Sequence, residues 1–278
     1  MVLDNLTKDD EIKDEVDIKD EERVNTSNEI IENETNEQEV KQIEISKHDF
    51  IFKNETNDLK IYFDKLKKIS SVTLQKQIIE YLENLELNLE NEKDKEVFFL
   101  VVNYFISIGQ INKSYELIEK YELNNDKYFS FYTGIKLNYL LSTFQLNEAC
   151  SFKESLNSNV ELNYFFLEKL DIFCLVLNDN QSEASLLNSI LIESEKNLDK
   201  YFQNLFLVIS DSSEQLNFDG DINGSQINSE LIFLYSAMTR IAELPFSHEF
   251  YELDKKNLSI PIILNQASAI DLRIKAAN

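Results

Sequence analysis

The chain has 278 residues, of which 51 are acidic and 27 are basic, so its formal net charge is −24. This acidic excess argues against direct binding to nucleic acid, because neutralising phosphates requires clustered Lys and Arg. Four glycines, two prolines and no tryptophan argue against a turn-rich β fold. Long amphipathic stretches rich in Leu, Ile, Phe and Tyr favour helices instead. No run of about 18 apolar residues occurs, so we expect no direct membrane insertion.

Residues 1–54 hold 17 acidic and 7 basic residues, a net charge of −10, and their only aromatic residues are Phe50 and Phe52. Such a segment buries too little apolar surface to offset its chain entropy, so we predict that residues 1–50 are disordered. A solvated acidic tail is the plain interpretation, and a recognition tail for a basic partner is the alternative. As written, the N-terminus has no apolar stretch after a basic start, which favours a cytoplasmic protein. An upstream signal peptide would make the protein periplasmic or exported.

The central part of the chain repeats every 35 residues. The segment 110–114 recurs at 145–149 and again at 180–184, and apolar positions around it keep the same register. These columns are Leu100/Ile135/Leu170, Val102/Leu137/Ile172, Phe105/Leu140/Leu175, Ile106/Leu141/Val176, Leu117/Phe152/Leu187 and Tyr121/Leu156/Leu191. A fixed period of this length is typical of stacked helix hairpins that bury each other's apolar faces. We therefore predict an all-α repeat domain over residues 55–278, clearest at 94–196; the alternative is an irregular helical bundle with an accidental period.

Each unit has a polar break that separates its two helices. The break ends in a residue suited to cap a helix N-terminus, and two positions later a small residue stands where the two helices approach closely. The predicted caps are Asn112, Asn147 and Ser182, and the small residues are Ser114, Ala149 and Ala184.

These hairpins resemble the tetratricopeptide repeat, a helix–turn–helix unit of about 34 residues. Gly109 stands five residues before Ser114, as that family's turn glycine stands before the alanine of its second helix, and Phe144 and Asp179 occupy the glycine position in the next two units. The resemblance implies an α-solenoid that mediates protein–protein contact. A weaker similarity, in 149–150, 173–174 and 244–245, is to uncharacterised exported bacterial helical-repeat proteins.

The two cysteines, Cys150 and Cys174, fall on consecutive helices that we expect to be antiparallel. With a turn near residues 159–160, Cys150 faces a position near Lys169, which leaves Cys174 roughly 7 Å away along the helix. Two buried thiols and a disulfide are therefore both open interpretations, and a disulfide would imply an oxidising compartment.

The segment 219–230 matches the calcium-binding EF-hand pattern D-x-[DN]-x-[DN]-G-x5-E. In that pattern, oxygen atoms surround the ion and a glycine permits the sharp turn. The predicted ligands are Asp219, Asp221, Asn223, the Ser225 carbonyl and Glu230. Gln226 and Ile227 depart from the pattern, and the chain has no second loop of this kind. The alternative is an irregular polar loop at 213–228, followed by a helix that Asn228 caps and that runs to Leu244.

Near the C-terminus, Ser259 followed by Pro261 predicts the start of another helix, which carries Ile262, Ile270 and Ile274 on its apolar side. The chain then stops without a polar capping unit, as expected for a piece of a longer protein.

The sequence contains two distant histidines, His48 and His248, and no nucleotide-binding glycine pattern or metalloprotease motif. We therefore expect a non-enzymatic scaffold that binds a protein or peptide, with no catalytic residues and no cofactor other than the candidate calcium ion. The alternative is an exported cell-envelope repeat protein stabilised by calcium and by a disulfide. A hydrolytic metal site at 219–230 is a third interpretation, disfavoured because such loops saturate their ion with protein oxygens.

Overall fold

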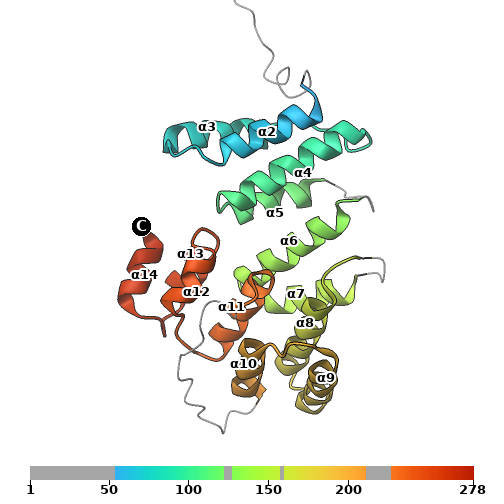
Figure 1. Ribbon diagram of the computed structural model, residues 1–278, viewed down its shortest axis with the longest axis vertical. Helices are drawn as coiled ribbons and strands as arrows, with labels where there is room; N and C mark the ends of the chain where they lie inside the picture. Colours follow the sequence, from blue (N-terminus) through green and yellow to red (C-terminus); the bar gives the residue numbers. More distant parts are fainter. Residues whose placement is uncertain (1–53, 122–126, 157–159, 211–226) are drawn as a thin grey trace, which may run out of the picture. The chain divides into compact units, whose positions relative to one another are not determined.

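The computed structural model describes residues 54–121, 127–156, 160–210 and 227–278 (Figure 1). The chain divides into the units Met1–Glu44 and Ile45–Asn278, and every described residue belongs to the second unit. The predicted disordered segment 1–50 therefore lies outside the described residues. Most of the predicted loop 213–228 lies outside them as well.

Within the described ranges the regular secondary structure is entirely helical, which confirms the predicted all-α class. The α-helices are α2 (Thr56–Leu66), α3 (Val72–Glu83), α4 (Glu92–Ser107), α5 (Ile111–Lys120), α6 (Phe129–Ser142), α7 (Leu146–Glu154), α8 (Tyr164–Leu177), α9 (Gln181–Ser194), α10 (Lys200–Ser210), α11 (Ile232–Ile241), α12 (His248–Leu253), α13 (Ser259–Leu264) and α14 (Ile270–Ala277). A short 3-10 helix, η2 (Ser229–Leu231), precedes α11. Among these described helices, none has the length and apolar character needed to cross a membrane.

The turns after α4, α6 and α8 have the same backbone geometry. Gly109, Phe144 and Asp179 all have positive φ, at 81°, 65° and 57°. In each turn the following N–H donates to the carbonyl five residues earlier: Gln110 to Phe105 at 2.8 Å, Gln145 to Leu140 at 2.8 Å, and Asn180 to Leu175 at 2.9 Å. Helices commonly end in this manner, with one residue in the left-handed conformation and a backbone hydrogen bond that spans five residues. Phe144 and Asp179 therefore adopt the backbone conformation for which Gly109 is best suited.

The predicted N-caps Asn112, Asn147 and Ser182 are wrong by two residues. Helices α5, α7 and α9 begin at Ile111, Leu146 and Gln181, and their N-cap residues make no side-chain capping bond. The physical reason is the tight turn, which redirects the chain within two residues, so that each second helix starts before the predicted cap. The Gln110 carbonyl, for example, already accepts the helical hydrogen bond from the Ser114 N–H at 3.1 Å.

The columns that recur every 35 residues supply much of the core. The columns of Leu100 and Val102 are buried in all three units, and so are the small residues Ser114, Ala149 and Ala184. The Ser114 hydroxyl donates to the Val102 carbonyl at 3.1 Å, which satisfies a polar group that is closed to solvent. Small side chains at these positions let the two helices of each hairpin approach closely, as the sequence predicts.

Consecutive helices from α4 to α9 pack against one another (Figure 1). Their apolar side chains belong to two hydrophobic clusters, one formed by α2–α6 and the other reaching from Ile111, at the start of α5, to α14. Helix α6 joins the two clusters, since Tyr132 and Ile135 belong to the first, and Leu137 and Leu141 to the second.

After α10 the chain returns to the earlier hairpins rather than continuing beyond α9. Helix α11 packs against α6 as well as α10. The Arg240 side chain donates to the Ser142 carbonyl at 3.3 Å, and its guanidinium lies 4.0 Å from the centre of the Phe144 ring. Further on, Lys256 and Asn257 donate to the carbonyls of Ser107 and Ile106 at 3.0 and 3.3 Å. Residues from the C-terminal part thus satisfy carbonyl groups at the ends of α4 and α6.

The single helix predicted from Ser259 is wrong, because the structure contains two short helices, α13 and α14, that pack against each other. The Asn265 side chain explains the break: its carbonyl oxygen accepts from the Ala267 N–H at 2.9 Å and its amide donates to the Leu244 carbonyl at 2.9 Å. Ile262 is buried as predicted, whereas Ile270 and Ile274 are exposed.

Candidate functional site

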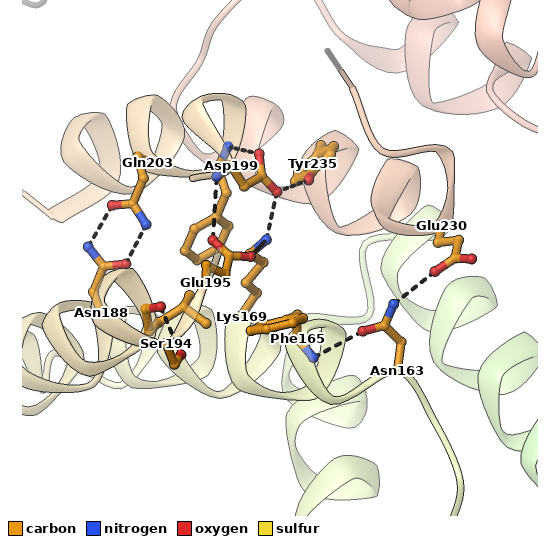
Figure 2. Close-up of polar contacts among 12 residues, drawn as sticks. Asn163, Phe165, Lys169, Asn188, Ser194, Glu195, Asp199, Gln203, Glu230 and Tyr235 are labelled. Atoms are coloured by element: carbon orange, nitrogen blue, oxygen red, sulfur yellow. Dashed lines mark hydrogen bonds and ion pairs between the residues drawn. The ribbon is translucent and has the colours of Figure 1, made fainter. Parts of the chain in front are cut away.

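Of the predicted calcium ligands, Asp219, Asp221, Asn223 and Ser225 lie outside the described residues. Glu230 is described and lies in η2, where its N–H donates to the Asn228 side chain at 3.0 Å. One Glu230 carboxylate oxygen accepts from the Asn163 side chain at 2.8 Å (Figure 2). Among the residues that the structure describes, no group of three or more His, Cys, Asp or Glu side chains is arranged to hold a metal ion.

The two predicted disulfide residues lie together on α7 and α8. The Cys150 and Cys174 sulfur atoms are bonded, at 1.99 Å, and their Cα atoms are 5.7 Å apart. The sequence estimate of an offset near 7 Å assumed a turn at residues 159–160. In the structure the two helices do not pair symmetrically about this turn, because Cys174, rather than a position near Lys169, lies opposite Cys150.

The most developed polar cluster of the described residues joins α8, the α9–α10 connection and α11 (Figure 2). Lys169 donates to one oxygen of Glu195 and one of Asp199, both at 2.7 Å. The Tyr235 hydroxyl donates to the same Asp199 oxygen. The side chains of Lys169, Glu195 and Asp199 are only 2, 7 and 10 % exposed. We call these four residues the Lys169 cluster.

Asp199 also organises the start of α10. Its second oxygen accepts from the Phe202 N–H at 3.0 Å, and the Asp199 N–H donates to Glu195 at 3.4 Å. The Lys169 ammonium lies 5.5 Å from the centre of the Phe202 ring, so an aromatic face contributes to holding the cation. Each charged group therefore has more than one partner, as a buried ion pair requires.

The Lys169 cluster has an excess of negative charge, since one ammonium faces two carboxylates. Burial, with the negative charge of Asp199, raises the pKa of Tyr235 well above its usual range, so this hydroxyl keeps its proton and remains a donor. The Tyr201 ring centre lies 4.9 Å from that of Tyr235, and burial raises the pKa of Tyr201 to about 12. Two protonated tyrosines thus lie at the junction of α10 and α11.

A second buried contact joins α9 to α10. The side-chain amides of Asn188 and Gln203 exchange two hydrogen bonds, both 2.8 Å long (Figure 2). This reciprocal pair satisfies polar groups that would otherwise be costly to bury.

The Lys169 cluster and the Asn188–Gln203 pair connect helices and are closed to solvent, so they offer no surface to a substrate. Sequence reasoning missed them, although one signal was present. Lys169 stands on the apolar stripe of α8, three residues after Phe166 and four before Phe173, and both phenylalanines are buried. A lone Lys on such a stripe indicates a buried ion pair, but its partners Glu195 and Asp199, in the α9–α10 connection, have no fixed spacing from it.

Outside these buried contacts, several large apolar side chains are exposed in pairs one helical turn apart. Leu186 and Ile190 form such a pair on α9. The others are Ile260 with Leu264 on α13 and Ile270 with Ile274 on α14. Single exposed apolar residues are ordinary, whereas groups of them indicate contact surfaces.

A comparison of the chain with protein-family models, curated proteins and solved structures finds no match. Function is therefore inferred from the residues and their contacts.

Proposed function

We propose that this protein is a non-enzymatic helical-repeat scaffold, a tetratricopeptide-like α-solenoid that binds a partner protein or peptide on its exposed faces. The observation that carries the proposal is the set of turns at Gly109, Phe144 and Asp179, which share one geometry at a spacing of 35 residues. Equal turns at equal spacing give successive hairpins equivalent positions, and stacked hairpins present extended surfaces suited to binding.

The chemistry of the described polar residues supports a binding role rather than catalysis. The Lys169 cluster combines an ammonium, two carboxylates and a phenol, but it is sealed between helices. By contrast, the exposed aliphatic pairs on α9, α13 and α14 stand on regular helices, which hold a contact surface in place.

Crosslinking of the full chain in its native host, followed by mass spectrometry, tests the scaffold. The expected result is a specific partner whose crosslinks map to the hairpins of residues 94–196. Failure to recover any partner, together with substrate turnover in an activity screen, would overturn the proposal.

The second candidate is an exported cell-envelope repeat protein stabilised by calcium at 219–230. The bonded sulfur atoms of Cys150 and Cys174 favour this candidate, because disulfides persist in oxidising compartments. Glu230 would bind the ion through both carboxylate oxygens. One of these oxygens accepts from Asn163, so calcium must compete with this contact.

A calcium titration of thermal unfolding tests the second candidate. If the loop binds calcium, the melting temperature rises with calcium and the rise disappears in Asp219→Ala. Asn163→Asp should then strengthen calcium binding, since it keeps the acceptor that caps α8 at the Phe165 N–H but removes the donor to Glu230. Identical melting temperatures with calcium and with EDTA would show that the loop does not bind calcium and would reject this candidate.

A further inference from the structure

Helix α9 departs from the two earlier second helices at two exposed positions. Leu186 and Ile190 are 62 and 53 % exposed. One period earlier the same columns hold Ser151 and Ser155, and two periods earlier Glu116 and Lys120, all of them exposed. The repeat thus has polar residues at these positions in its first two units and aliphatic residues only in the third.

The charged residues of α9 have a single sign. Glu183 and Glu193 are exposed and stand three residues before Leu186 and three residues after Ile190, so the four side chains follow one line along the helix. No Lys or Arg occurs anywhere in α9. We call Glu183, Leu186, Ile190 and Glu193 the α9 stripe.

The negative charge of the α9 stripe indicates which kind of partner can bind there. If two copies of the chain paired their α9 helices in antiparallel fashion around Leu186 and Ile190, Glu183 of one copy would face Glu193 of the other, and like charges repel. Parallel pairing places each glutamate opposite itself. The chain's own N-terminal segment, with a net charge of −10 over residues 1–54, is disfavoured for the same reason.

We propose that the α9 stripe docks an amphipathic helix of a partner protein, with two aliphatic residues one turn apart flanked by Lys or Arg. The aliphatic residues cover Leu186 and Ile190, and the basic residues face Glu183 and Glu193, so that charge fixes the alignment of the two helices. This inference rests on the proposed scaffold function and adds to it a face and a class of partner.

The test uses the full chain and a synthetic helix about four turns long. This probe carries two leucines one turn apart, flanked by lysines, and a matched probe has glutamates in place of the lysines. Fluorescence anisotropy should detect binding of the lysine probe, and binding of the glutamate probe should be at least about tenfold weaker.

The informative variant is Leu186→Ser with Ile190→Ser, which introduces the residues that the second unit already carries at these columns. This double variant should retain the helical circular dichroism spectrum of the wild type. Its affinity for the lysine probe should be about tenfold lower or more. Ile270→Ser, at another exposed aliphatic position, is the matched control and should leave binding unchanged. Glu193→Lys should reduce the preference for the lysine probe over the glutamate probe.

Three outcomes would overturn the inference: equal binding by the wild type and the double serine variant, equal binding of both probes, or a wild-type dimer that the double variant abolishes. Different results would reject the scaffold proposal and the α9 proposal. If crosslinking recovers the same native partner with the wild type and the double variant, the scaffold stands and the α9 stripe is rejected. If the lysine probe binds at α9 but crosslinking recovers no native partner and the activity screen finds substrate turnover, the scaffold proposal is rejected and the α9 stripe stands as a peptide-binding face.

Discussion

Gly109 and Lys256, far apart in the sequence, are in direct contact in the fold. A Cβ atom placed on Gly109 would lie 2.6 Å from the Lys256 Cβ and 3.2 Å from the Lys256 carbonyl carbon. Gly109 therefore meets two requirements at once, a positive φ and space for a neighbouring backbone. The contact joins the end of α4 to the connection between α12 and α13.

Gly109→Ala should destabilise the protein by roughly 2–4 kcal/mol, because alanine is strained at positive φ and its methyl group would press on Lys256. Denaturant unfolding followed by circular dichroism measures this change. The matched control is Asp179→Gly, at an equivalent turn that is exposed. This change should be neutral or stabilising by up to about 1 kcal/mol, since glycine relieves the strain of a left-handed residue. An equal loss in both variants would contradict the contact between Gly109 and Lys256.

Lys169→Met should cost roughly 3–5 kcal/mol of unfolding free energy, because it leaves two buried carboxylates without their cation. The same denaturant experiment measures it. Adding Glu195→Gln and Asp199→Asn to Lys169→Met should recover part of the loss, since the carboxylate charges are then gone. A loss below about 1 kcal/mol would mean that the Lys169 cluster is hydrated and open.

Tyr201 should make the protein sensitive to alkali. Its pKa is raised to about 12 by burial, above the ordinary value of about 10. A raised folded pKa gives a stabilisation that is complete below pH 10 and is lost as the pH rises towards 12, about 2–3 kcal/mol in all. Tyr201→Phe removes this ionisation and should move the alkaline unfolding midpoint to higher pH. Glu168 raises the pKa of the exposed Tyr164 as well, but solvent screens this effect, so Tyr164→Phe should shift the midpoint much less than Tyr201→Phe.

The Cys150–Cys174 bond closes a loop with a sequence separation of 24 residues. Removing it should lower the unfolding free energy by about 3 kcal/mol, because the open unfolded chain gains conformational entropy. A reducing agent and the Cys150→Ser, Cys174→Ser double variant should give the same loss. Protein from the native host whose mass shows two free thiols, and whose stability does not respond to reductant, would support the alternative of two buried thiols.

Much of the helical framework was readable from the sequence. The all-α class, the hairpin columns and the positions of Gly109, Phe144 and Asp179 follow from periodicity, because helices and their turns depend on residues a few positions apart. The N-caps were misplaced because the left-handed turn shortens the connection, and Phe144 and Asp179 give no local sign of a positive φ.

The sequence alone therefore determined the hairpins of residues 94–196 and which of their columns face inward, since local spacing decides both. The tertiary structure decided which helices meet. Arg240 contacts Ser142 across 98 residues, and Asn257 contacts Ile106 across 151. Lys169 on α8 donates to Asp199 in the α9–α10 connection, which also accepts from Tyr235 on α11. The first two contacts arise when the C-terminal part of the chain returns to α6 and α4, and the third arises when α10 and α11 pack beside α8. In each case, carbonyl groups or buried charges require partners that no spacing along the chain specifies.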